Sequence, residues 1–124
     1  DDTMCGDFDD QERIDEELFE RFADLIQHFG VEPKANGSDA PLQLDTQNGR
    51  AAYLDRLFRA GLTRCVTDAA SLPIGERMDA LAGQAIVFAR LAGFLTAQFP
   101  PDTDLFRMVT GAVVDGHSEP AALR

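Results

Sequence analysis

The chain has 124 residues, of which 11 are Lys or Arg and 22 are Asp or Glu, so its formal net charge is −11. This length accommodates one domain with one core, and a hydrophobic fraction of 44% argues against a disordered chain. The deficit of Lys and Arg argues against sequence-independent binding to nucleic acid or to anionic membranes, since both need an excess of cationic side chains.

The acidity is concentrated at one end of the chain. Residues 1–24 hold eleven acidic and two basic residues, a net charge of −9, whereas the rest of the chain carries a net charge of −2. We expect residues 1–8 to form an acidic, disordered segment and residues 9–116 a single helical-bundle domain. We expect residues 117–124 to form a frayed C-terminal tail.

The first predicted helix spans residues 10–29 and ends at Gly30, a residue that commonly stops helices. Its apolar residues recur at helical spacing: Leu18, Phe22, Leu25 and Phe29. Its acidic residues repeat every four positions: Glu12, Glu16, Glu20 and Asp24. Like charges at this spacing repel by roughly 0.2–0.5 kcal/mol per pair. The acidic line has three interpretations: a solvated face that aids solubility, a docking surface for a basic protein partner, and a cation site. Mimicry of nucleic-acid charge is a special case of the docking surface.

The second predicted helix spans residues 47–70, after a long loop, with Asp45 or Thr46 as its cap. Apolar residues recur along it at three- and four-residue steps, which predicts one buried face. Tyr53 and Leu57 lie partly off this stripe, beside Arg64. An aromatic, an aliphatic and an arginine side chain together suit an interface hot spot, and a wide core face is the alternative.

The third predicted helix carries an unbroken heptad pattern. Ser71 is its expected cap, with Pro73 in the first turn. The apolar seam runs over 26 residues: Ile74, Met78, Leu81, Ala85, Phe88, Ala92, Leu95 and Phe99. Its other sides are also largely apolar, so we expect it to be buried on nearly all sides. Residues 80–99 have membrane-spanning length, but the near-central Arg90 would be costly in lipid and argues against a span.

The fourth predicted helix spans residues 103–115, with Asp102 as cap and Gly116 as stop. No segment shows strand periodicity. The sequence therefore predicts an all-α fold, a small antiparallel bundle of about four helices with a long, centrally buried third helix. Because the fourth helix is about half as long as the third, we expect a second copy to complete the coverage, as a homodimer.

Signatures of enzymes and metal sites are missing. The chain has no Gly-rich phosphate loop, no nucleophile elbow and no His-Glu-x-x-His run. Asp24 and His28 are four positions apart, but one helix offers too few convergent ligands for tight metal binding. We therefore assign no catalytic, cofactor-binding or metal-binding residue. The sparse cysteines, Cys5 and Cys65, fit a reducing, cytoplasmic compartment.

We expect a non-enzymatic protein–protein interaction or regulatory module, a homodimer with a basic protein as a further partner, without direct contact to nucleic acid or a membrane. The candidate interaction surface comprises Glu12, Glu16, Glu20, Asp24, Tyr53, Leu57 and Arg64. The alternative function is a helical bundle that binds an apolar small molecule, because nine Phe and three Met are available to line a pocket. A catalytic bundle would require His28 and the carboxylates of residues 10–29 to converge on a cleft.

Overall fold

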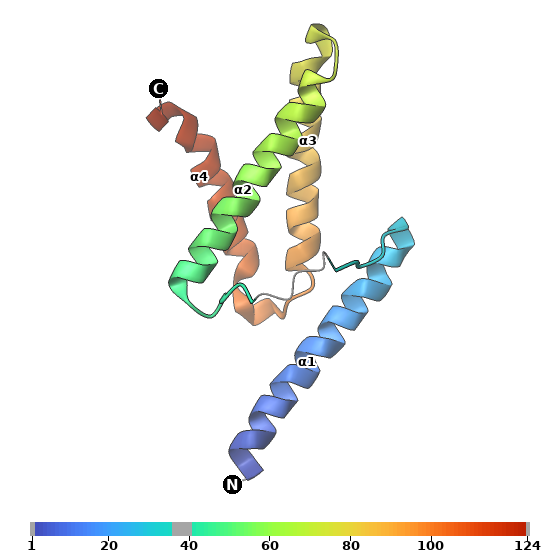
Figure 1. Cartoon of the computed structure of the whole chain (residues 1–124), viewed down its shortest axis with the longest axis vertical. Helices are drawn as coiled ribbons and strands as arrows, with labels where there is room; N and C mark the ends of the chain where they lie inside the picture. Colours follow the sequence, from blue (N-terminus) through green and yellow to red (C-terminus); the bar gives the residue numbers. More distant parts are fainter. Residues whose placement is uncertain (1, 36–40, 124) are drawn as a thin grey trace. The chain divides into compact units, whose positions relative to one another are not determined.

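The computed structural model describes residues 2–35 and 41–123, with side chains from residue 11 onward. Within these ranges it has four α-helices, two short 3-10 helices and no strand, so the predicted all-α fold is confirmed (Figure 1). The chain divides into two units, residues 1–38 and residues 39–124. The first contains one long α-helix with its capping turn, and the second contains the other three α-helices.

Helix α1 spans Asp2–Ile26 and continues as the 3-10 helix η1, Gln27–Phe29. It begins well before the expected start at residue 10, so most of the segment expected to be disordered has a helical backbone. Acidic residues near a helix N-terminus interact favourably with the helix dipole, which accounts for this extension. The predicted stop is confirmed: Gly30 has a φ of 72°, and its N–H donates a hydrogen bond of 2.9 Å to the Gln27 carbonyl oxygen.

Helix α2 spans Gln47–Ala70, the range expected from the sequence. Of the two residues proposed as its cap, Thr46 has that role, since its Oγ1 atom accepts a hydrogen bond of 3.0 Å from the Gly49 N–H. The Thr46 hydroxyl also donates to the Gln43 carbonyl oxygen at 2.9 Å. These bonds hold the turn before α2 close against the first turn of the helix.

Helix α3 spans Ile74–Thr96, and the cap proposed for it is wrong. The Ser71 hydroxyl instead donates a hydrogen bond of 2.8 Å to the Thr67 carbonyl oxygen, so it closes the end of α2. Pro73 precedes the first turn of α3 with extended backbone angles, φ −56° and ψ 150°. The Thr67 carbonyl oxygen also accepts a hydrogen bond of 3.2 Å from the Ser71 N–H, so both the backbone and the side chain of Ser71 bond to the last turn of α2.

Helices α2 and α3 form an antiparallel hairpin that is closed near its turn and open at the other end (Figure 1). Near the turn lies Ala69, 5% exposed and the one buried residue in the part of the chain that the structure describes. Farther from the turn, Leu54 on α2 remains 62% exposed. The hairpin therefore has a small closed core and a splayed apolar end.

The predicted central burial of α3 is wrong. Its heptad seam is open, with Ile74 80% and Met78 72% exposed. Among the residues from Ile74 to Gln84, the half-buried ones are instead Ala80 and Gln84, because α2 lies on their side of α3. Helix α2 shields one side of α3 and α4, Leu105–Leu123, makes a smaller contact with it, but a helix apolar on nearly all sides needs more neighbours than this unit provides.

Helix α4 spans Leu105–Leu123, after the 3-10 helix η2, Pro101–Thr103. The residue before α4 is Asp104, whose carbonyl oxygen accepts from the Met108 N–H at 3.2 Å, so the proposed cap Asp102 is wrong. Gly116, the expected stop, lies inside the helix, as does Pro120. The whole of residues 110–123 is exposed, so water can satisfy backbone groups that the helix leaves unbonded there.

Candidate functional site

The acidic line on α1 consists of Glu12, Glu16, Glu20 and Asp24, all of which are exposed. Among the side chains that the structure describes, none forms an ion pair with these four carboxylates. Four-residue steps shift by about 40° around a helix, so the line winds gradually along one side of α1. The four carboxylates therefore form a line of negative charge along one side of α1, and Arg13 lies on the same side.

The apolar stripe of α1 lies on the opposite side of the helix from the acidic line. Within this stripe Leu18, Phe22 and Ile26 are half-buried, whereas Phe19 at its edge is 58% exposed. The rings of Phe19 and Phe22 lie 6.3 Å apart between centroids, tilted by 53°. Because the two stripes face in opposite directions, a partner that covers the apolar stripe leaves the acidic line accessible.

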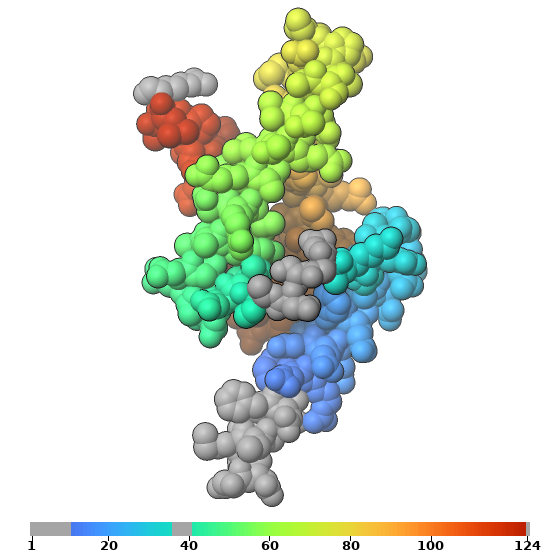
Figure 2. Space-filling model, in the orientation of Figure 1, coloured from blue at the N-terminus to red at the C-terminus, as the bar shows by residue number. Residues whose placement is uncertain are grey.

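The proposed hot spot on α2 is assembled on one side of that helix. Tyr53 is half-buried, Leu57 is 50% exposed, and the three residues fall within about 40° of each other on an α-helix. The Arg64 side chain is 75% exposed and pairs with Asp68, with 3.0 Å between Nε and Oδ2. Much of α2 lies uncovered on the face drawn in Figure 2. An exposed pair of this kind contributes little to stability, so Arg64 remains available to a partner.

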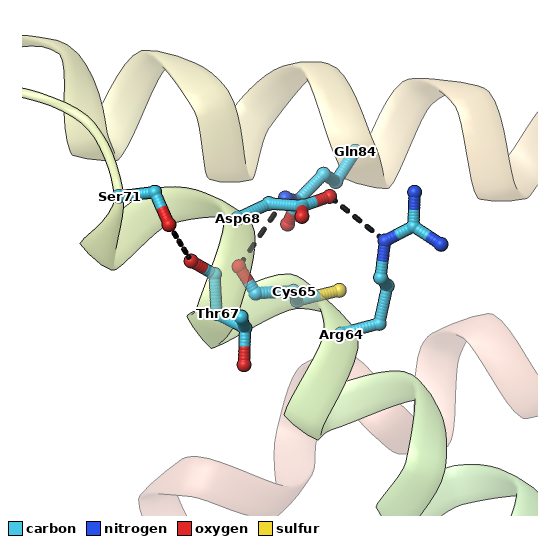
Figure 3. A network of polar contacts seen from close by, with 6 residues as sticks. All are labelled: Arg64, Cys65, Thr67, Asp68, Ser71 and Gln84. Atoms are coloured by element: carbon cyan, nitrogen blue, oxygen red, sulfur yellow. Dashed lines mark hydrogen bonds and ion pairs between the residues drawn. The ribbon is translucent and has the colours of Figure 1, made fainter.

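A polar contact joins α2 to α3 where the hairpin is closed (Figure 3). The Nε2 atom of Gln84 donates a hydrogen bond of 3.3 Å to the Cys65 carbonyl oxygen. The Oε1 atom of Gln84 is buried and has no hydrogen-bond partner in the described part of the chain. The sequence shows Gln84 only as a polar residue within an apolar run, and the contact depends on the relative position of two helices.

The open end of the hairpin is a feature that the sequence did not reveal. There the facing sides of α2 and α3 expose large apolar side chains, with Phe58 57%, Leu91 49% and Leu95 42% exposed. We call Leu54, Phe58, Leu91 and Leu95 the splayed apolar face. The amphipathic pattern identifies these residues as core, but the splaying of the two helices determines that they remain accessible.

Helix α3 is long and apolar enough to cross a membrane, with a mean hydropathy of 1.4 over its most apolar window and none of that window buried. One such helix is weak support for a span, because core helices of soluble proteins have the same composition. Arg90 lies in the C-terminal half of α3, where a charged side chain in hydrocarbon would be costly.

A metal-binding cluster is not formed by the described residues. Among them, no three His, Cys, Asp or Glu side chains are grouped so as to hold a metal ion. His28 lies in η1, one turn after Asp24. Neither the pair nor the acidic line converges with another element of the first unit, which contains one long helix.

Comparison with known proteins supplies no relative for this chain: no protein-family model, no curated protein and no solved structure matches it. The function is therefore argued from the residues and their geometry.

Proposed function

We propose that this chain is a non-enzymatic protein–protein interaction module that acts as a homodimer. The observation that carries the proposal is the exposure of large apolar side chains on each helix of residues 41–123, such as Leu54 at 62%, Ile74 at 80% and Phe106 at 69%. Monomeric proteins rarely expose apolar patches larger than a few hundred Å². Contact with a second polypeptide would supply the core that one copy of these helices lacks.

We further propose that the acidic line of α1 is the docking surface for a basic protein. Its support is the band of four exposed carboxylates without ion-pair partners among the described side chains. The like-charged spacing weakens the helix slightly, so a basic partner would stabilise it on binding. Electrostatic docking of this kind accelerates association and weakens as salt increases.

Sedimentation equilibrium of the full chain tests the homodimer. We expect a species of twice the chain's 13.5 kDa at micromolar concentration, in equilibrium with the monomer on dilution. A monomer throughout the accessible concentration range would contradict the proposal. Native mass spectra of the same sample would reveal a bound apolar molecule, the outcome that favours a ligand-binding bundle instead.

A synthetic helical peptide with four Lys residues at four-residue spacing tests the docking surface. We expect the double variant Glu16→Lys, Glu20→Lys to weaken peptide binding about tenfold, in line with the loss of close charge pairs at an interface. The matched control is the double variant Glu76→Lys, Asp79→Lys on α3. It changes the net charge by the same amount and should leave peptide binding almost unchanged. Equal losses in both variants would show attraction to the net charge alone and would contradict a specific surface.

A further inference from the structure

We propose that the second copy packs into the open end of the α2–α3 hairpin, so that the splayed apolar faces of two hairpins close on each other. This inference rests on the proposed homodimer and assigns the surface that forms it. The occupant is a second copy of this chain, and the interface is isologous, because each copy presents the same face to the other.

The hydrogen bond between Gln84 and Cys65 defines which sides of the two helices face each other. Phe58 and Leu54 lie 7 and 11 residues before Cys65, and Leu91 and Leu95 lie 7 and 11 residues after Gln84. Steps of 7 and 11 residues return to within about 20° of the same side of an α-helix. In an antiparallel hairpin the four residues therefore form two levels, Phe58 with Leu91 and Leu54 with Leu95.

On α2, exposure along this common side rises with distance from the turn. It is 5% at Ala69, next to the turn, but 57% at Phe58 and 62% at Leu54. The opposing residues of α3 are exposed by 49% at Leu91 and 42% at Leu95. Apolar side chains at one level that packed fully against each other would exclude water, so these four leave space for apolar groups from another chain.

The exposed area matches what a dimer interface needs. The apolar side chains on and beside the splayed apolar face are about half exposed: Leu54, Phe58, Leu62, Phe88, Leu91 and Leu95. At about 200 Å² for a large apolar side chain, they offer on the order of 600 Å² per copy. A standard interface buries about 800 Å² per partner, so these side chains supply most of it and flanking backbone supplies the rest.

The charges of this unit permit self-association. Residues 39–124 contain ten acidic and eight basic residues, a net charge of −2, so two copies of the unit repel each other weakly. Two arginines of α2 are paired within the helix, Arg59 with Asp55 at 2.8 Å and Arg64 with Asp68 at 3.0 Å. The weak net charge of the unit therefore leaves the attraction between two copies to the apolar side chains.

The test compares glutamate substitutions on and off the splayed apolar face in the full chain. Phe58→Glu and Leu91→Glu lie on the face, and their controls are Val66→Glu on α2 and Ile86→Glu on α3. The control positions are 60% and 72% exposed, and on their helices Val66 lies about 100° from Cys65 and Ile86 about 160° from Gln84. We expect the face variants to raise the dissociation constant at least 100-fold and the controls to leave it within threefold, measured by sedimentation.

The outcomes separate this inference from the proposed function. A dimer that survives both face variants, or that dissociates only with Ile86→Glu or Val66→Glu, would overturn the assigned surface while leaving the homodimer intact. A wild-type chain that is monomeric at all concentrations would refute the homodimer itself. Circular dichroism of each variant verifies that its helices are retained.

Photo-crosslinking gives a second readout that needs no disruptive substitution. Replacing Phe58 with benzoyl-phenylalanine retains an aromatic ring on the splayed apolar face. We expect irradiation to yield a covalent dimer whose cross-links map to residues 54–62 or 88–95 of the other copy. The same probe at Ile86 should give little covalent dimer. Cross-links from position 58 that stay within one chain, or that reach only residues 105–123 of the other copy, would overturn the proposal.

Discussion

The side-chain amide of Gln84 on α3 donates a hydrogen bond to the Cys65 carbonyl oxygen on α2, while its own Oε1 atom is buried without a partner among the described residues. A buried polar group without a hydrogen bond costs about 1–3 kcal/mol, whereas one made hydrogen bond contributes about 0.5–1.5 kcal/mol. The Gln84 amide therefore joins the two helices but either lowers the free energy of unfolding or adds little to it.

Gln84→Met should leave the free energy of unfolding unchanged or raise it by up to about 1 kcal/mol, because it removes the hydrogen bond and the unsatisfied acceptor together. Gln84→Glu should lower it by about 2 kcal/mol, since a carboxylate would be desolvated beside the Cys65 carbonyl oxygen. Urea unfolding at a fixed chain concentration measures both. A loss above about 1 kcal/mol for the Met variant would show that the hydrogen bond outweighs the orphaned oxygen.

Gly49 is required by the turn that precedes α2. A Cβ atom at this position would collide with the backbone of Gln43 and would lie 2.8 Å from the Leu42 carbonyl oxygen. Gly49→Ala should therefore lower the free energy of unfolding by about 1–3 kcal/mol, the usual cost of overpacking. The matched control is Gly83→Ala on α3, where a Cβ atom meets nothing within 4 Å and should stabilise the helix by about 0.5–1 kcal/mol. Equal effects of the two substitutions would refute the steric argument.

Arg64 and Arg59 form similar pairs one helical turn from an aspartate, and both side chains are about three-quarters exposed. Arg64→Met and Arg59→Met should each change the free energy of unfolding by less than about 0.5 kcal/mol. The proposed hot spot contains Arg64 but not Arg59. Urea unfolding measures both substitutions, and a loss above about 1 kcal/mol with either would contradict the small contribution expected of an exposed pair.

Glu16 lies between Glu12 and Glu20 on the acidic line. Glu16→Lys replaces two repulsions with two attractions, so it should stabilise α1 by about 0.8–2 kcal/mol at low salt. Glu76→Lys is the control, and it should destabilise the start of α3 because Glu76 is acidic in the first turn of that helix. Hydrogen exchange of the amides in residues 11–26 and 76–82 measures the two effects. A fall in α1 protection on Glu16→Lys would contradict the repulsion along the line.

The midpoint of thermal unfolding should increase with chain concentration, because a homodimer unfolds with dissociation. This dependence of the midpoint on concentration should be lost in Phe58→Glu and kept in Val66→Glu. Differential scanning calorimetry at two concentrations a hundredfold apart measures it. A midpoint that does not depend on concentration in the wild-type chain would count against a dimer coupled to folding.

The sequence by itself determined the all-α fold and the bounds of α2, but not the extension of α1 to Asp2 or of α4 to Leu123. Apolar spacing, the Thr46 cap and the Gly30 stop are local signals, and the structure confirms α2 over Gln47–Ala70 and the end of the first helix. The sequence also determined the acidic line on α1, because helical periodicity alone places those carboxylates along one side. It was less accurate at three positions: Ser71 bonds back to α2, Asp104 rather than Asp102 precedes α4, and Gly116 lies inside α4. A residue type that favours a helix end acts as one only where the backbone ends the helix.

Only the tertiary structure decided which apolar residues are covered. The heptad seam of α3 predicts burial, yet Ile74 and Met78 are mostly exposed, because α2 meets α3 on the side of Gln84. The periodicity of the sequence indicates which side of a helix a side chain occupies. The burial of that side chain depends on where the neighbouring helices lie. The splaying of α2 from α3 therefore turned Phe58 and Leu91 from expected core into the accessible face proposed for a second copy.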